Sequence, residues 1–209
     1  MQTPEALVER FQEKAEAVSA VVTRVASPRE ALDYTVNLCD HKEACQLLVA
    51  GCEAPLSTPA ETLCTDKQAK LIAAPDLPPD QMATLSELCD ARGIQLTTNT
   101  LREHLAGIDI GLTYADFGIA ETGTLIIESS SEETRLATMI SEIHVAVLPL
   151  SRLRESAYEV EADLRDTMGQ APNYTAFITG ASRTADIERV LALGVHGPLE
   201  LHILMWKDA

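Results

Sequence analysis

The stretch Ile143–Leu148, IHVAVL, is an almost continuous apolar run and decides the fold class. Such a run is typical of a strand that is buried on both faces, as in a parallel sheet. A capping box at 130–133 predicts a helix before it, and the polar segment 153–168 predicts another helix after it. A strand between two helices indicates crossover connections and therefore a mainly parallel sheet.

The same alternation extends over most of the chain. Further strands are predicted at 47–50, 70–74, 94–98, 108–113, 124–128, 174–179 and 201–205, and further helices at 4–25, 31–40, 79–92, 101–105 and 183–193. We expect an α/β fold, a three-layer α/β/α sandwich with a mostly parallel, Rossmann-like sheet. Residues 1–44 are expected to form a helical segment packed on the core, and residues 45–209 to form the α/β domain.

The charge balance and the apolar runs exclude several classes of protein. The 209 residues include 16 Lys and Arg against 32 Asp and Glu, which gives a formal net charge of -16. A surface this negative repels phosphate backbones, so nucleic-acid binding is not expected. No apolar run reaches the roughly 20 residues of a membrane span, and the N-terminus lacks the basic-then-apolar pattern of a signal peptide. We expect a cytoplasmic protein without a membrane span.

The cysteines do not form a metal-binding motif. Cys39, Cys45, Cys52, Cys64 and Cys89 include no C-x-x-C pair, which zinc and iron–sulfur sites normally use. We expect ordinary thiols and no metal on this chain, although a redox or metal role of the first three stays open.

The segment 111–128, GLTYADFGIAETGTLIIE, is the first candidate site. It places Asp116, Glu121, Thr122, Gly123 and Thr124 between two predicted strands. A carboxylate such as Glu121 on a tight turn could act as a general base or as a nucleophile. The alternative is an ordinary turn, in which this glutamate caps amides or pairs with an arginine.

The segment 177–188, FITGASRTADIE, is the second candidate site. Ser182, Arg183 and Thr184 would open a helix, whose free amides form a cradle for a carboxylate or phosphate. The alternative is an ordinary capped helix, in which Asp186 suits the helix dipole. His196 and Gly197 follow in a tight turn and could reach the same ligand. His144 and His202 alternate with apolar residues and are predicted to be structural.

Together, the runs AETGT, SRTADIE and GVHGP resemble the LUD-domain family, specifically its lactate-utilisation C type, over about residues 45–206. The resemblance implies a fold similar to the NagB/RpiA/CoA-transferase group. It also implies a place in a cytoplasmic three-protein system that oxidises L-lactate to pyruvate. The iron–sulfur clusters of that system are expected on partner proteins, with no cofactor on this chain.

The resemblance also assigns residues. Glu121 would be catalytic by analogy with CoA transferases, and the remaining motif positions would bind the ligand: Asp116, Thr122, Gly123, Thr124, Ser182, Arg183, Thr184, Asp186, His196 and Gly197. Ala181 departs from the family, which more usually has proline there. We expect the Glu121 and Arg183 regions to line one cleft for a small anion, a hydroxy- or keto-acid, possibly phosphate-bearing. The alternatives are a stand-alone sugar-phosphate or CoA-transfer enzyme that uses Glu121, or a non-catalytic scaffold subunit.

Overall fold

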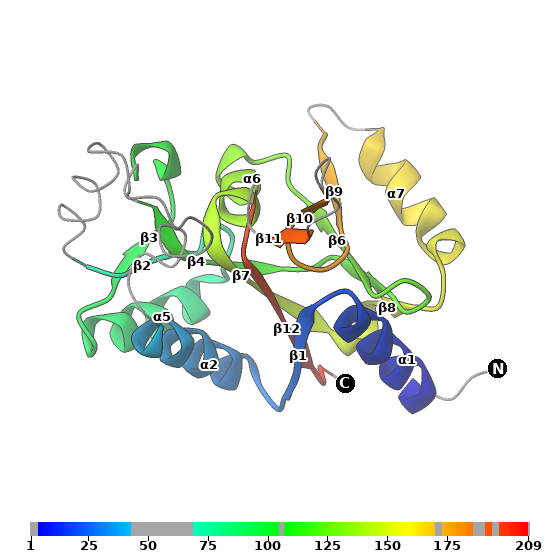
Figure 1. Cartoon of the computed structure of the whole chain (residues 1–209), viewed down its shortest axis with the longest axis horizontal. Coiled ribbons are helices and arrows are strands. Elements are labelled where there is room, and N and C mark those ends of the chain that lie inside the picture. The colour runs from blue at the N-terminus through cyan, green and yellow to red at the C-terminus, as the bar shows by residue number, and fades with distance from the viewer. Residues whose placement is uncertain are drawn as a thin grey trace.

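A six-stranded parallel sheet forms the centre of the molecule (Figure 1). The computed structural model describes residues 4–42, 69–104, 107–169, 173–185, 191–193 and 197–208. In spatial order the strands are β1 (Ala20–Val25), β12 (Glu200–Trp206), β7 (Ser141–Pro149), β4 (Ile108–Tyr114), β2 (Leu71–Ala73) and β3 (Gln95–Thr97). The predicted mainly parallel α/β sheet is confirmed.

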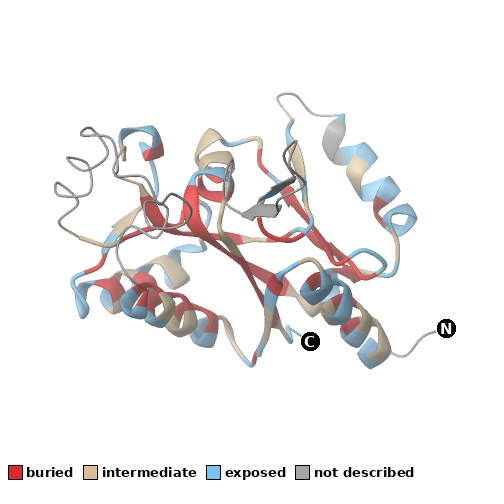
Figure 2. Cartoon of the chain, viewed as in Figure 1, coloured by how far each residue is buried: buried red, intermediate tan, exposed pale blue. Residues whose placement is uncertain are grey.

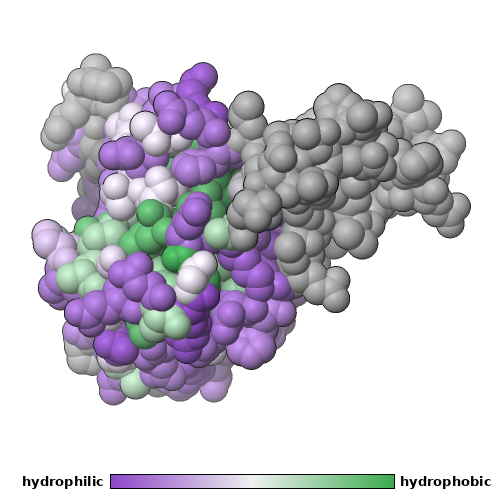
Figure 3. All heavy atoms as spheres, turned by 90° about the vertical axis from the view of Figure 1, so that its left-hand side faces the viewer, coloured by the Kyte–Doolittle hydropathy of each residue, from purple (hydrophilic) through white to green (hydrophobic). Residues whose placement is uncertain are grey.

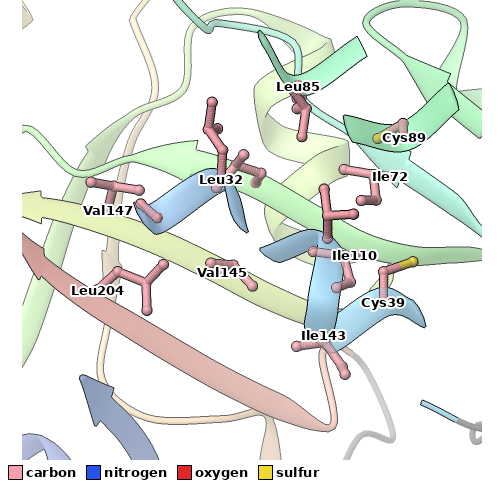
Figure 4. Packing of buried hydrophobic residues seen from close by; sticks show 14 of the residues in the cluster. Leu32, Cys39, Ile72, Leu85, Cys89, Ile110, Ile143, Val145, Val147 and Leu204 are labelled. Carbon is pink, nitrogen blue, oxygen red and sulfur yellow. The ribbon is translucent and has the colours of Figure 1, made fainter. Parts of the chain in front are cut away.

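Helices cover both faces of this sheet. On one face, α2 (Pro28–His41) and α5 (Pro79–Asp90) pack on the strands through a buried cluster that includes Leu32, Leu85 and Val145 (Figure 4). On the other face, α1 (Pro4–Ala17) packs through a second cluster, and α6 (Glu132–Met139) packs against β4 and β7. Because successive residues of a buried strand point to opposite faces, neighbours in β7 belong to different clusters. The predicted three-layer arrangement is confirmed, and the buried residues concentrate along the central strands (Figure 2).

A second, four-stranded sheet lies on the α1 side and was not predicted. Its order is β8 (Leu153–Arg154), β5 (Phe117–Ile119), β6 (Thr124–Glu128) and β9 (Thr175–Ile178). One face packs toward α1 and the central sheet through Leu125 and Ile127. The other face packs against the 3₁₀ helix η3 (Ala157–Val160) and α7 (Glu161–Met168). Two further 3₁₀ turns are η1 (Leu101–Glu103) and η2 (Leu150–Arg152).

The predicted helix at 4–25 is wrong in its second half. The helix ends at Ala17, Ser19 adopts a left-handed conformation with φ 68°, and β1 follows as an edge strand paired with β12. The run Val21-Val22-Thr23 is β-branched and favours a strand once a partner strand is available. Residues 4–42 therefore contribute a strand to the central sheet, and the division of the chain near residue 44 stays a prediction.

Two other predicted helices are also wrong. The first half of the predicted long helix at 153–168 is replaced, because Leu153–Arg154 pairs with β5 as β8 and α7 begins only at Glu161. The predicted helix at 183–193 is replaced by an antiparallel pair, β10 (Arg183–Ala185) and β11 (Leu191–Leu193). The Ser182 N–H donates to Pro198 O at 3.0 Å, so the backbone of this serine pairs with the segment at residue 198 and does not begin a helix.

The remaining expectations concern the short elements and the surface. The predicted strand at 47–50 lies outside the described residues. The other predicted strands match observed strands, and the predicted helices at 31–40, at 79–92 and after the capping box at 130–133 match α2, α5 and α6. The short helix predicted at 101–105 is observed as the 3₁₀ turn η1. The side formed by β3 and the end of α5 is mainly hydrophilic around a smaller hydrophobic area (Figure 3). In the part of the chain that the structure describes, no helix has the length and apolar character needed to cross a bilayer.

Candidate functional site

A cleft of about 320 Å³ lies between α6 and the edge strand β9. Its lining consists of Arg135, Thr138, Met139, His144, Tyr174, Ala176, Phe177, Ile178, Thr179, Gly180, Ala181, Ser182, Gly197, Pro198 and Leu201. Side chains of successive strand residues point to opposite faces, so a cavity lined by every residue from 176 to 178 runs along the strand's edge. β6 pairs with the opposite edge of β9. The cleft therefore lies at the free edge of the second sheet, next to the central sheet.

The charge of this lining differs from that of the whole protein. The chain carries 32 acidic residues in 209, yet the described residues of the lining include no carboxylate and one cation, Arg135. Elsewhere such an acidic surface repels anions, so the lining is locally suited to an anionic ligand. The volume falls at the lower end of the roughly 300–1,000 Å³ range of small-molecule sites.

Arg135 is held so that half of its guanidinium stays available. Its Nη1 donates to Ser129 O at 2.8 Å and to Ser130 O at 2.9 Å, and its Cζ lies 5.5 Å from the centroid of the Tyr174 ring. The cation–π contact and the two hydrogen bonds fix the orientation of the group. A guanidinium has five N–H donors, and within the described ranges Nε and Nη2 donate to no protein acceptor. This edge has the geometry that binds a carboxylate through two parallel hydrogen bonds.

His144 lies at the buried end of the cleft. It projects from β7, is 1% exposed, and its Nε2 lies 2.9 Å from Thr113 Oγ1 on the neighbouring strand β4. Burial lowers the pKa of His144 from 6.5 to about 4, because an imidazolium loses its hydration there. The ring is therefore neutral at pH 7 and can donate or accept a hydrogen bond.

Close packing of α6 on the sheet forms the wall next to this histidine. Gly111 is the β4 neighbour of His144, and a Cβ on that glycine would stand 2.0 Å from Ala137 O. Only a residue without a side chain lets α6 come this close. Thr138 and Met139, at the end of α6, line the cleft together with His144.

Two of the predicted ligand residues, Ser182 and Gly197, line this cleft. They come from separate motifs, and the Ser182–Pro198 hydrogen bond joins the two segments. A Cβ on Gly197 would lie 3.2 Å from Ser182 Cβ, so the glycine lets the serine approach. The sequence thus located part of the cleft, although the helix terminus expected at Ser182 is not there.

Glu121 does not line this cleft. It is exposed at the tip of the β5–β6 turn, and its N–H donates to Glu155 O at 3.0 Å. Gly123 has the left-handed conformation that was expected, with φ +66°, but its free side faces the backbone of α1. A series of hydrogen-bonded hydroxyl groups connects this turn to the cleft. Thr122 Oγ1 lies 2.7 Å from Thr124 Oγ1, which lies 2.8 Å from Oγ1 of Thr179, a residue that lines the cleft.

Asp116 lines a separate cavity of about 550 Å³ between the second sheet and α7. It accepts a hydrogen bond from the Glu128 N–H at 2.6 Å. Burial raises the pKa of Asp116, and the backbone hydrogen bond and Arg152 only partly offset this effect. Asp116 is therefore separated from the cleft that holds Ser182.

The structure describes only some of the other predicted ligand residues. Arg183 is exposed on β10 and is not part of the lining of the cleft. The backbone of Thr184 belongs to the same strand. Asp186 and His196 lie outside the described residues. The assignment of these positions to ligand binding stays a prediction, and the expected pairing of Glu121 with Arg183 in one cleft is not what this cavity shows.

The cysteines in the described ranges are not reactive groups of the cleft. Cys39 and Cys89 are fully buried in the cluster under α2 and α5. Burial raises the pKa of Cys39 to about 12 and that of Cys89 to about 11, so both are thiols at neutral pH. Cys45, Cys52 and Cys64 are outside the described part. Where side chains are described, no three His, Cys, Asp or Glu residues gather as a metal site would require.

Sequence reasoning missed Arg135 and His144. The sequence analysis did not single out Arg135, and it predicted His144 to be a structural group in an apolar strand. A buried strand that places a histidine among apolar neighbours was the available signal, because a buried imidazole needs hydrogen-bond partners. The partner of His144, Thr113, is 31 residues away in the sequence.

Comparison with known proteins identifies the family. The sequence pattern described as the LUD domain matches residues 8–205. A relative named "Lactate utilization protein C" from Halalkalibacterium halodurans is 36% identical over 103 residues, 48% of this chain and 45% of the relative. A protein of the same name from Shouchella clausii is 35% identical over 102 residues, 48% of this chain and 44% of the relative. The match thus spans less than half the length of these curated relatives.

A solved structure has the same fold. The crystal structure of a DUF162 family protein from Deinococcus radiodurans superposes with a TM-score of 0.60, covers 99% of both chains, and is 15% identical in sequence. At this identity the likeness shows the fold alone. The domain match extends over nearly the whole sequence, and this chain therefore belongs to the LUD domain family.

Proposed function

We propose that this chain acts in lactate utilisation, and that its cleft binds the carboxylate of a small hydroxy- or keto-acid such as L-lactate or pyruvate. The names of its relatives support the process. The observation that carries the binding site is the available guanidinium edge of Arg135, in a lining whose described residues include no carboxylate.

The proposed binding mode follows from the polar groups of the cleft. Nε and Nη2 of Arg135 would bind the carboxylate as a fork, and Ser182 and Thr179 would supply hydroxyl groups beside it. The apolar side chains of Phe177 and Met139, each about half exposed, border the cleft and would contact the short carbon chain. The cleft is larger than a three-carbon acid needs, so it leaves room for water or for a group from a partner.

Oxidation of L-lactate to pyruvate releases two electrons and two protons, and the electrons need an acceptor. In this proposal the acceptor is a partner protein that carries iron–sulfur clusters, as the family resemblance implies. The part of this chain is to bind and present the acid as a component of that cytoplasmic system.

A stand-alone enzyme that uses Glu121 has less support. A nucleophilic carboxylate must touch its substrate, and Glu121 is exposed on a turn that borders neither this cleft nor the cavity beside α7. We therefore place no catalytic step on Glu121.

Deletion of the gene in its native host tests the process. The deletion strain is expected to grow poorly with L-lactate as the carbon source and normally with glucose, and wild-type protein should restore growth on L-lactate. Arg135→Gln should restore it poorly, whereas Arg165→Gln, on the exposed face of α7, should restore it fully at equal protein level. Growth of the deletion strain on L-lactate at the parental rate would contradict the proposed process.

A further inference from the structure

His144 has one nitrogen whose partner is known and one whose partner is not. Its Nε2 faces Thr113 Oγ1 at 2.9 Å. Within the described residues, His144 has no other hydrogen-bonding partner. An imidazole has two ring nitrogens, and both normally form hydrogen bonds in a protein interior. The question is therefore what Nδ1 meets.

Within the described residues, Nδ1 of His144 has no protein hydrogen-bond partner, although the residue is only 1% exposed. The cavity that His144 lines is the cleft between α6 and β9. A ligand there can satisfy Nδ1.

The pair formed by Thr113 and His144 can present either polarity to a ligand. If the threonine hydroxyl donates to Nε2, then Nδ1 carries the proton and donates to an oxygen. If Nε2 carries the proton and donates to the threonine, then Nδ1 accepts a hydrogen bond. The first form fits the ketone oxygen of a keto-acid, and the second fits the hydroxyl group of a hydroxy-acid.

We propose that His144, positioned by Thr113, recognises the α-oxygen of the bound acid, whether that oxygen is a hydroxyl group or a ketone. This inference rests on the proposed function, in which Arg135 binds the carboxylate. It adds the group that distinguishes α-oxygenated acids from plain carboxylic acids, and it makes the cleft able to hold both members of a hydroxy-acid and keto-acid pair.

Calorimetric titration with three acids tests this role. L-lactate and pyruvate carry the α-oxygen, and propionate has the same carbon chain without it. The wild-type protein is expected to bind the first two about tenfold more tightly than propionate. His144→Phe should remove this preference and leave the propionate affinity within about twofold, because the carboxylate contact is unchanged.

Variants of Thr113 separate positioning from folding. Thr113→Val keeps the size of the side chain and removes the hydroxyl group, so the preference for L-lactate over propionate should fall severalfold. Thr113→Ser keeps the hydroxyl group and should restore it. If His144→Phe does not fold, Thr113→Val and Thr113→Ser carry the test.

The outcomes distinguish this inference from the proposed function. A wild-type protein that binds none of the three acids contradicts the proposed function, and the role of His144 falls with it. Binding of all three acids with equal affinity contradicts the role of His144 alone. Equal weakening of all three acids by both His144→Phe and Thr113→Val would show a structural role and would also overturn the inference. The ¹⁵N shifts of the imidazole give a second readout: Nδ1 should respond to L-lactate, and the ring should not titrate between pH 6 and 8.

Discussion

The backbone of Gly123 lies directly against the backbone of Ala15, so closely that a Cβ on the glycine would stand 2.3 Å from Ala15 N. Gly180 makes the same kind of contact just after the end of α1, where a Cβ on this glycine would stand 2.1 Å from Val18 O. Both glycines have positive φ, +66° and +76°. The second sheet, which carries the β9 edge of the cleft, is thus seated on the end of α1 through two residues that have no side chain.

Gly123→Ala is expected to destabilise the protein by at least about 3 kcal/mol, because it combines left-handed strain of about 1–2 kcal/mol with overlap on α1. Gly93→Ala is the matched control, because Gly93 has φ +65° and no atom within 4 Å of its added Cβ. Urea denaturation followed by circular dichroism measures both variants. Equal losses for the two would show that contact with α1 adds nothing.

A buried ion-pair network joins α2 to two central strands. Lys42 Nζ lies 2.6 Å from Asp109 Oδ1 and 2.7 Å from Glu142 Oε2, and all three side chains are at most 3% exposed. The other oxygen of Asp109 accepts the Leu71 N–H at 2.7 Å. Replacement of Lys42 by a neutral residue would leave the carboxylates of Asp109 and Glu142 buried without their cation.

Lys42→Met should lower the free energy of unfolding by about 3–5 kcal/mol, the usual cost of removing one partner of a buried ion pair. Lys207→Met, at an exposed site, should change it by less than about 0.5 kcal/mol. Burial lowers the pKa of Lys42, and the hydrogen bonds to Asp109 and Glu142 outweigh burial, so its pKa lies above 10.5. The network's contribution is therefore complete below pH 10.5 and is lost as the pH rises through the folded-state pKa. An alkaline loss of stability that is unchanged in Lys42→Met would contradict this account.

His144 should make the protein sensitive to acid. Its pKa is about 4 in the folded state and 6.5 when exposed, so the unfolded chain binds the proton first. Stability that is present above pH 6.5 is lost as the pH falls toward 4, by about 3 kcal/mol in total. Comparison of urea denaturation at pH 7 and pH 4.5 should show a smaller acid loss in His144→Phe than in the wild type.

The control for this prediction is His41→Gln, because His41 is exposed at the end of α2. Its acid loss should equal that of the wild type. If His144→Phe loses as much stability on acidification as the wild type does, then the histidine is not buried and neutral as described.

The parts of the fold that local pattern determines could be predicted from the sequence. β7 is evident because IHVAVL is apolar along both faces. β1 was missed because Val18, Val22 and Val25 fit a helical period, whereas the strand forms only beside β12, about 180 residues later. The β10 strand was missed because Ser182-Arg183-Thr184 has the composition of a helix start, while its backbone pairs with β11 and Pro198.

The candidate site divides in the same way. Ser182 and Gly197 could be found from motifs that are unusual in sequence. Arg135 and His144 could not, because their roles depend on the approach of α6 to β9 and on the Thr113 hydroxyl group across the sheet. Glu121 attracted attention as a carboxylate in a glycine turn, and the structure places it on the surface beside Glu155.

Titration of the protein with L-lactate at pH 7 tests most directly whether Arg135 binds the carboxylate of the acid. Arg135→Gln removes the charge and two parallel donors, so its Kd should be at least tenfold higher than that of the wild type. Arg165→Gln, whose side chain is 76% exposed, should bind within twofold of the wild type. Equal affinity of the wild type and Arg135→Gln for L-lactate would contradict the account.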